Sequence, residues 1–425
     1  MSEQKVMNRW LVVVGAILIQ LCLGAIYAWS VFTQPLTDAG WSKVQTQIVF
    51  SAGLAAFAVV MVIAGRMMPR VGPRKLAMAG GIVLGLGYIL GGLIGAESFY
   101  ATLVCVGLIG GAGIGLGYVV PIAVGMKWFP DKKGLITGLA VAGFGFGALL
   151  WIYLGGQWGQ LIANYGVSQT FIIFGVAFAA LVLLGSIWMV NPPAGWLPKR
   201  YTPPAAAKAG AKTVAGTVDF TSGQMLATPQ FYMILLTFAF GAGAGLTVIG
   251  VIKLFGIESM TAKGMSKAEA SAIAGTAMAV FYALANGIGR IAWGTISDKI
   301  GRKASIVIMT AIQGVVVILF QWMAGTPALL YLAAALIGFN FGGNFALFPT
   351  ITADTFGTKN IGQNYGWVFL AYGIGGIVGP IMSGWLGDIK KFELAFTILG
   401  AMCLVGAVII GCVTHPKKKD LATAA

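Results

Sequence analysis

Charged residues are scarce in this chain of 425 residues, where only 9% are Asp, Glu, Lys or Arg and 58% are hydrophobic. A soluble fold of this size needs a more polar surface, so the composition indicates a protein whose solvent is largely lipid. Because open sheet edges cannot exist in hydrocarbon, long apolar runs predict membrane-spanning helices. The net charge of +15 would suggest nucleic acid as a partner of a soluble protein, but here basic loops on one side of a bilayer explain it.

Residues that usually perform chemistry are also rare. The only histidine is His415, and none of the twelve acidic residues lies in the middle of an apolar run. The cysteines stand in apolar runs without a Cys-x-x-Cys spacing or a nearby histidine, so neither a disulfide framework nor a metal site is encoded. We therefore expect neither an enzyme nor a bound cofactor or metal ion. The four cysteines are most simply packing residues: Cys22, Cys105, Cys403 and Cys412.

Apolar runs long enough to cross a bilayer, which takes roughly 20 residues, recur along the whole chain. They predict an all-α membrane protein with twelve transmembrane helices. The expected spans are 10–33, 46–68, 76–95, 99–124, 134–156, 169–190, 228–252, 270–297, 304–323, 327–349, 364–387 and 393–413. An even number of spans places both ends of the chain on the same side of the membrane.

Basic residues indicate which side that is. Of the 27 lysines and arginines, 20 fall in the termini and in the loops after the even-numbered spans, and only six fall in the opposite loops. Because positive loops stay in the cytoplasm, both termini are expected there, in a multi-pass protein of the bacterial inner membrane. The first residues, MSEQKVMNRW, are polar and lead directly into the first span, which favours a signal anchor over a cleaved signal peptide.

A stretch rich in Pro, Ala, Gly and Lys interrupts the apolar pattern at residues 192–226. We expect a cytoplasmic linker there, between two six-helix bundles at 1–191 and 227–425. The bundles resemble each other at a shift of about 228 residues, which places Pro121 opposite Pro349. Two joined repeats are typical of a carrier that rocks one bundle against the other around a central cavity, so the sequence predicts transport by alternating access.

A loop motif that occurs twice supports the duplication. The copy after the eighth span reads Gly294-x-x-x-Asp298-x-x-Gly301-Arg302-Lys303, which resembles the loop signature of the major facilitator superfamily. Its first glycine allows helices to approach closely, and its aspartate can meet a helix N-terminus or an arginine across a cytoplasmic gate. The copy after the second span keeps Gly65, Gly72 and Arg74 but has Pro69 at the acidic position, which puts a charge-paired gate in doubt in the first half.

Arg290 is the charged residue that most needs an explanation. It lies eight residues before Asp298, and therefore about 12 Å inside the end of a straight helix. An arginine at this depth is costly in hydrocarbon and normally faces a cavity or a partner. We favour a clamp that offers a carboxylate two parallel hydrogen bonds over a snorkelling side chain or an internal ion pair. Asn286, one turn earlier, can contact the substrate, hold the guanidinium, or join two helices.

Two further groups of residues are candidates for the site. Lys253, near the outer end of the seventh span, is a possible second cation but is more simply a snorkelling or gate residue. Aromatic side chains near the middle of several spans can together enclose a small apolar group, although each alone is more often a packing residue. These aromatic residues are Tyr27, Tyr118, Phe144, Phe341, Phe345 and Tyr372.

Along most of its length the chain resembles the oxalate/formate antiporter family and, more distantly, the animal monocarboxylate transporters. The stretches that carry the resemblance are NRW at 8–10, IYAWSVF at 26–32, GY at 117–118, KWFPDKKGLITG at 127–138, TPQFY at 228–232, NGIGR at 286–290 and NYGWVFLAYG at 364–373. The resemblance implies small carboxylates as substrates. It also implies Arg290 as the carboxylate ligand, with Tyr118 and Phe144 as the helix 4 and helix 5 aromatic residues of the site.

Two departures from those families bear on the substrate. The oxalate exchanger has a helix 11 lysine where this chain has Tyr372, so the second cation that suits a dicarboxylate is absent. The animal carriers have an aspartate where this chain has Asn286 and a helix 1 lysine near the position of Tyr27, so their proton relay is not reproduced. One core cation matches one carboxylate, which favours a proton-coupled monocarboxylate transporter of the lactate, pyruvate or formate class.

Other functions remain open alternatives. The nearest is an oxalate/formate-type anion exchanger that uses Lys253 as its second cation. An exporter of hydrophobic drugs or sugars is weaker, because drug exporters often carry a membrane-core acid in their first half and this chain has none. A membrane enzyme or a transceptor is weaker still, since no catalytic cluster and no signalling domain is visible.

Overall fold

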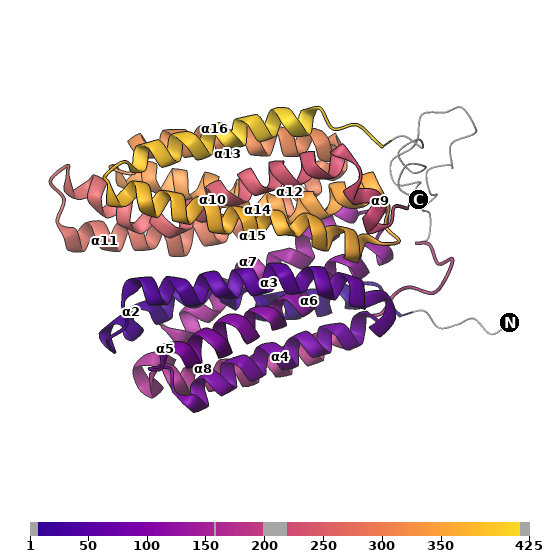
Figure 1. The fold of residues 1–425 in the computed structure, drawn as a ribbon, viewed down its shortest axis with the longest axis horizontal. Coiled ribbons are helices and arrows are strands. Elements are labelled where there is room, and N and C mark those ends of the chain that lie inside the picture. Colours follow the sequence, from indigo (N-terminus) through magenta and orange to yellow (C-terminus); the bar gives the residue numbers. More distant parts are fainter. Residues whose placement is uncertain (1–6, 157–158, 199–218, 417–425) are drawn as a thin grey trace. The chain divides into compact units, whose positions relative to one another are not determined.

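The computed structural model describes residues 7–156, 159–198 and 219–416, and in these ranges every regular element is helical. The chain forms two compact units (Figure 1). Unit 1 comprises Met1–Ser222 together with Thr352–Trp367, and unit 2 comprises Gly223–Ile351 together with Val368–Ala425. The domain boundaries expected from the sequence stay a prediction, because most of the expected linker, and the lysines that close the chain, lie outside the described residues.

The helices of unit 1 pack as a bundle in which α4 lies against α8, α3 against α6, and α1 against α7. One segment is a 3₁₀-helix, η1, and one is a wide π-helix, η2, and both interrupt a long span. The elements are α1 (Trp10–Leu23), η1 (Gly24–Trp29), α2 (Ser30–Asp38), α3 (Lys43–Val71), α4 (Pro73–Ile94), α5 (Phe99–Thr102), η2 (Leu103–Gly110), α6 (Gly111–Trp128), α7 (Lys133–Gly155) and α8 (Leu161–Ser186).

In unit 2, α13 and α10 both pack against α16, as α4 and α1 pack against α8 in unit 1. Its π-helix, η3, comes directly before the helix that carries Arg290. The elements from the linker onward are α9 (Ser222–Leu226), α10 (Pro229–Thr261), α11 (Lys267–Thr276), η3 (Ala277–Tyr282), α12 (Ala283–Ile300), α13 (Arg302–Met323), α14 (Pro327–Phe356), α15 (Ile361–Asp388) and α16 (Phe392–Gly411). The end of α14 and the start of α15 belong to unit 1.

Twelve segments of the described chain are long and apolar enough to cross a membrane, which confirms the predicted all-α fold of twelve spans. Each overlaps one predicted span, and the differences lie at the ends. The sixth begins at Leu161 rather than 169, because the polar stretch around Gly166 is helical on both sides of a break where that glycine has φ 76°. The tenth continues to Phe356 through Pro349, whose missing N–H is tolerated inside a buried helix.

Several helices begin where the sequence supplies a cap. Ser42 and Gln45 form a reciprocal capping box at the start of α3, in which each side chain bonds the other's backbone. The Thr228 hydroxyl accepts the Phe231 N–H at the start of α10, where proline occupies the first turn. These caps satisfy backbone donors that would otherwise be unpaired at the membrane surface.

The two copies of the loop motif fold in the same way. Gly72 joins α3 to α4 with φ 87° and ψ 151°, and Gly301 joins α12 to α13 with φ 91° and ψ 153°. This backbone conformation is costly for a residue with a Cβ atom, which explains glycine at both positions. The repeat inferred from the sequence is therefore present in the backbone of both units.

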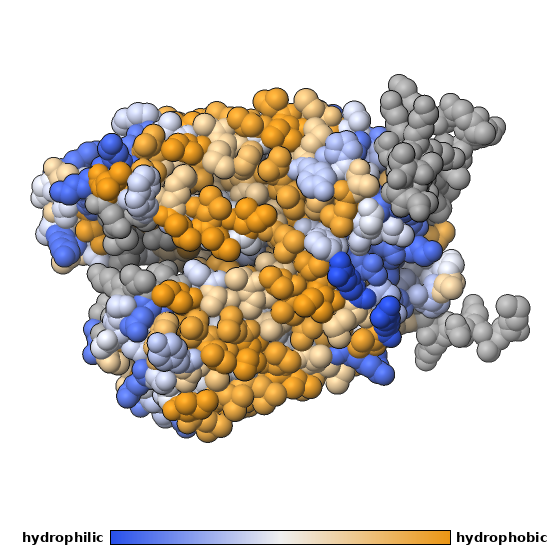
Figure 2. All heavy atoms as spheres, viewed as in Figure 1, coloured by the Kyte–Doolittle hydropathy of each residue, from blue (hydrophilic) through white to orange (hydrophobic). Residues whose placement is uncertain are grey.

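Large apolar side chains cover the outside of the helices. Figure 2 shows them as orange surface along the helices, with blue, hydrophilic residues gathered toward the helix ends. Val59 on α3 and Val408 on α16 are 56% and 68% exposed, respectively. In water such surfaces would favour aggregation, whereas lipid chains accept them without cost.

Substitution of the loop glycines tests the shared backbone conformation. Gly72→Ala and Gly301→Ala each meet no atom within 4 Å, so only the positive φ opposes the methyl group. We expect each variant to lose about 1–3 kcal/mol of unfolding free energy and to melt at a lower temperature in detergent. Gly275→Ala is the matched control, because it also meets open space but lies in α11 without a positive φ. Equal melting temperatures for all three variants would contradict this account.

Candidate functional site

Arg290 lies on α12 and its side chain is completely buried. Its Nε donates a hydrogen bond of 2.9 Å to Oδ1 of Asn286, one turn earlier on the same helix. The guanidinium carbon lies 4.2 Å from the centre of the Phe345 ring on α14. An amide and an aromatic face thus hold the cation deep in unit 2, where Arg290 is the only charged residue among the buried side chains that the structure describes. This placement differs from that of an arginine that snorkels to the membrane surface.

Glycines on both helices bring α12 and α14 close enough for this contact. A Cβ atom added to Gly289 would collide with the backbone of Phe339, and one added to Gly342 would collide with the carbonyl of Asn286. The Trp293 indole also donates to Oδ1 of Asn340 across the same pair of helices, at 3.2 Å. Small residues permit the approach and a side-chain hydrogen bond fixes its register, so Phe345 is positioned over Arg290 by backbone packing.

Aromatic residues surround the Phe345 ring. Phe341 and Tyr372 meet it edge-on, with ring centres at 5.2 and 5.4 Å, and Tyr282 lies 6.1 Å from Phe341. The Tyr282 hydroxyl donates to the carbonyl of Gly245 on α10, at 3.3 Å. Unit 2 therefore brings together five of the predicted site residues, namely Asn286, Arg290, Phe341, Phe345 and Tyr372.

Unit 1 contains a second aromatic group. The Phe144 ring on α7 meets Tyr27 of η1 at 5.2 Å and Tyr118 of α6 at 5.3 Å, both edge-on. Phe57 of α3 completes the group, with ring centres 5.0 Å from Tyr118 and 6.1 Å from Phe144. The structure thus clusters the three predicted aromatic residues of the first half and adds Phe57, which sequence reasoning missed.

Close helix contacts again position this group. A Cβ atom on Gly24, the first residue of η1, would collide with the backbone of Phe144, and one on Gly147 would collide with the carbonyl of Leu21. The Gln20 amide donates to the carbonyl of Tyr118 at 3.3 Å, which joins α1 to α6 inside the bundle. The 3₁₀ turns of η1 follow directly and place Tyr27 against α7.

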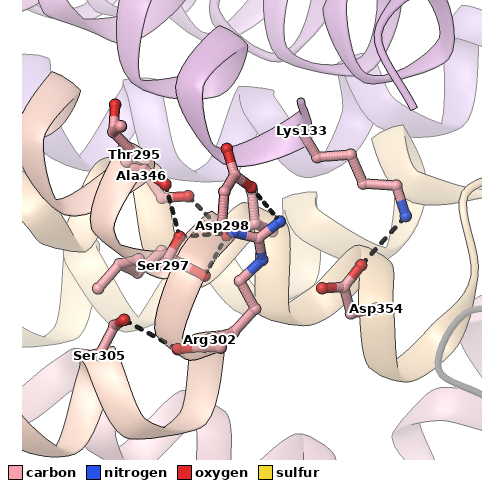
Figure 3. Close-up of polar contacts among 12 residues, drawn as sticks. Lys133, Thr295, Ser297, Asp298, Arg302, Ser305, Ala346 and Asp354 are labelled. Carbon is pink, nitrogen blue, oxygen red and sulfur yellow. Dashed lines mark hydrogen bonds and ion pairs between the residues drawn. The ribbon is translucent and has the colours of Figure 1, made fainter. Parts of the chain in front are cut away.

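The second copy of the loop motif forms a local network at the end of α12, shown in Figure 3. Asp298 pairs with the Arg302 guanidinium at 2.6 Å, and Arg302 also donates to the Ser297 hydroxyl at 2.6 Å. Lys303 donates to the carbonyl of Val413 at 3.1 Å. The aspartate of the motif thus contacts the arginine at the N-terminus of the next helix, where its charge also complements the helix dipole. Gly294 is buried at the same helix end.

The first copy makes different contacts, all inside unit 1. A Cβ atom on Gly65 would collide with the carbonyl of Gly362, so the backbones of α3 and the start of α15 touch there. The Arg66 guanidinium lies 4.9 Å from the centre of the Trp367 ring, and Arg74 donates to the carbonyl of Ile187 at 2.6 Å. These contacts do not involve a carboxylate.

An ion pair joins α7 to the end of α14 within unit 1. Lys133, at the start of α7, lies 3.1 Å from the carboxylate of Asp354 near the end of α14, as Figure 3 shows. Both side chains are largely shielded from solvent, with exposures of 17% and 23%. The sequence did not predict this ion pair or the Arg66–Trp367 contact. The partners in each pair are far apart in the chain, and no local pattern distinguishes them from other residues of their helices.

Lys253, the possible second cation, belongs to α10, but its side chain is outside the described part of the structure. Within the described residues, no group of three or more His, Cys, Asp or Glu side chains could hold a metal ion. The described buried side chains also include no Asp, Glu or His.

Comparison with known proteins identifies the family. The model of the Major Facilitator Superfamily matches residues 10–264 and 257–424. The MFS-type transporter YhjX of Escherichia coli is 30% identical over 87% of this chain and 86% of its own length. The oxalate:formate antiporter of Oxalobacter formigenes is 28% identical over 92% of this chain and 88% of its own length.

A solved structure agrees at the level of the fold. The fucose:proton symporter FucP of E. coli superimposes with a TM-score of 0.66, covering 95% of this chain and 98% of its own, at 15% sequence identity. A likeness at this identity supports the architecture alone. Together with the family match over nearly the whole sequence, it shows that this chain belongs to the Major Facilitator Superfamily of membrane transporters.

Proposed function

We propose that this transporter carries a small monocarboxylate together with a proton, by alternating access, with Arg290 as the carboxylate ligand. The observation that carries the proposal is the burial of one arginine among aromatic rings at the core of unit 2. Burying a cation in a membrane bundle costs free energy, and a buried arginine at such depth is typical of a binding site for an anion. The similarity to the oxalate:formate antiporter supports a carboxylate as that anion.

The geometry of Arg290 suits one carboxylate. Asn286 accepts a hydrogen bond from Nε and so orients the guanidinium, and a guanidinium can give a carboxylate two parallel hydrogen bonds. Phe345 covers one face of the guanidinium and keeps its plane fixed. Asn286 acts here as a positioning residue for the cation rather than as a direct substrate ligand.

Aromatic rings supply the apolar part of the proposed site. Phe341, Phe345 and Tyr372 present edges and faces that suit a short carbon chain better than a second charge. Tyr27, Tyr118 and Phe144 are proposed as further substrate residues, and their clustering around one ring in unit 1 supports this. A substrate with one carboxylate and a methyl-sized remainder, such as lactate, pyruvate or formate, fits this chemistry.

Charge balance favours a monocarboxylate and a proton. One guanidinium neutralises one carboxylate, whereas a dicarboxylate would leave a second anion in a low-dielectric interior. The described buried side chains offer no carboxylate or imidazole to hold a proton. We therefore propose that the proton travels on the substrate carboxylate itself, while Arg290 balances the charge of the carboxylate in its ionised form.

An oxalate/formate-type exchanger is the second candidate. The similarity to the Oxalobacter antiporter over most of both chains favours it. Tyr372 argues for the first candidate, because a phenol is not a cation that could pair with a second carboxylate. The orientation that we propose, with both termini in the cytoplasm of a bacterial inner membrane, is supported by the distribution of basic residues.

Replacing Arg290 tests the clamp. We expect Arg290→Gln to reduce lactate uptake into proteoliposomes by roughly 100-fold or more, since it removes a charge-assisted pair of hydrogen bonds. Arg290→Lys should lose more than about tenfold, because an ammonium lacks the planar fork. The melting temperature of each variant in detergent is the control for folding. Wild-type uptake by the lysine variant would show that the fork is not the ligand.

A pH gradient tests the coupling. An inside-alkaline gradient should drive lactate accumulation in proteoliposomes, because a proton enters with each substrate and the gradient supplies the driving force. Oxalate should compete poorly, since its second carboxylate has no cation to meet. Collapse of the gradient with a protonophore should abolish accumulation. Accumulation that ignores the gradient but requires formate or oxalate inside the vesicles would support the exchanger instead.

Labelling from outside tests the orientation. A cysteine introduced at position 210, in a variant without Cys412, should not react with a membrane-impermeant maleimide in intact cells. It should react after the cells are permeabilised, because the linker is expected in the cytoplasm. A cysteine at position 264, in the loop between α10 and α11, is the matched control and should react in intact cells. The opposite pattern would invert the topology.

A further inference from the structure

The segment Thr352–Trp367 groups with unit 1, although the residues on both sides of it in the chain belong to unit 2. It comprises the end of α14, a loop and the first turns of α15. Carriers of the proposed kind must move such a segment away from the first half when the site opens on that side. The contacts that hold the segment within unit 1 are therefore the contacts that must be broken.

The packing of this segment relies on glycine. Gly65 touches the backbone of Gly362, the Met68 methyl group lies over Gly362, and Gly366 packs against Met61 and Val62 on α3. At these points glycine lets the backbone of the segment approach α3 closely. Glycine contacts bring the backbones close but contribute no side-chain hydrogen bond or ion pair. Polar or charged side chains are therefore needed to hold the ends of the segment in place.

An ion pair and a cation–π contact hold the two ends of the segment. Lys133 and Asp354 form an ion pair of 3.1 Å near the start of the segment. Arg66 lies 4.9 Å from the centre of the Trp367 ring at the end of the segment, and the rest of that indole is partly buried. The motif that carries Arg66 runs from the end of α3 into α4. It has Pro69 at the position where the second copy has the acidic Asp298, and its other charged residues, Arg70, Arg74 and Lys75, are all basic.

We propose that Arg66 and Trp367 form a cation–π latch that holds the segment closed, in a motif that has no carboxylate of its own. An aromatic face attracts a guanidinium without bringing a negative charge into a basic loop. In the second copy, by contrast, Asp298 is bonded to Arg302 of its own loop. The two repeats thus share one backbone turn but surround it with different side-chain contacts. This inference rests on the proposed transport cycle but not on the identity of the solute.

The latch is tested by the reactivity of a cysteine beneath the segment. Met68→Cys, in a Cys412→Ser background, places a thiol beside Gly362, while Cys22, Cys105 and Cys403 remain buried. A membrane-permeant maleimide should label the introduced thiol slowly in proteoliposomes without substrate. Trp367→Leu and Arg66→Gln should each raise the labelling rate roughly two- to fivefold, the range expected for an exposed cation–π pair. The double variant should label no faster than either single variant, because both remove one interaction.

Matched variants make the result decisive. Trp367→Phe keeps a ring and should label close to the parental rate, and Arg70→Gln removes an exposed arginine of the same loop and should have no effect. The Cys412→Ser background without Met68→Cys reports unfolding through its three buried thiols. Unchanged labelling in Trp367→Leu, additive effects in the double variant, or an equal effect of Arg70→Gln would each overturn the latch. Because no substrate is present, failure here is separate from failure of the monocarboxylate proposal.

Discussion

The burial of the Arg290 guanidinium is the constraint on which the rest of unit 2 depends. A cation in the core of a membrane bundle costs several kcal/mol unless partners are fixed around it, on the order of 2.5–3.5 kcal/mol by insertion scales. Asn286 supplies a hydrogen bond and Phe345 supplies a ring face. Gly289 and Gly342 let α12 and α14 approach closely enough for Phe345 to reach Arg290. Phe341 and Tyr372 pack edge-on against Phe345 in the same region.

The two units show one architecture adapted to two tasks. Their loops after the second and eighth spans share the same glycine conformation, at Gly72 and Gly301. Only unit 2 places a fully buried charge among the described residues, whereas the aromatic group of unit 1 is built around Phe57 and Phe144. A duplicated scaffold can therefore keep its folding signals in both halves while the polar chemistry diverges between them.

Much of the fold could be predicted from the sequence because lipid imposes a simple rule on apolar runs. All twelve spans were found from hydropathy, and the helical spacing of Asn286 and Arg290 predicted that they share a face. The widened turns of η2 and η3 and the tight turns of η1 could not be predicted, because they result from packing between helices and not from local sequence. Phe57 was missed for a related reason: a phenylalanine in an apolar run looks the same whether it faces lipid, core or site. The Trp367 contact with Arg66 joins residues about 300 positions apart, which no local pattern reports.

The position of Asn286 on the same helix as Arg290 has a consequence for how the protein is made. Spans enter the membrane in chain order, so α12 is present before α14 and its Phe345 have been synthesised. During that interval Arg290 has only the partners that its own helix and the earlier helices provide. The amide one turn away is one of these, and it can accept the Nε hydrogen bond as soon as α12 has formed. Asn286 is therefore placed to satisfy one donor of the guanidinium before Phe345 is available to cover it.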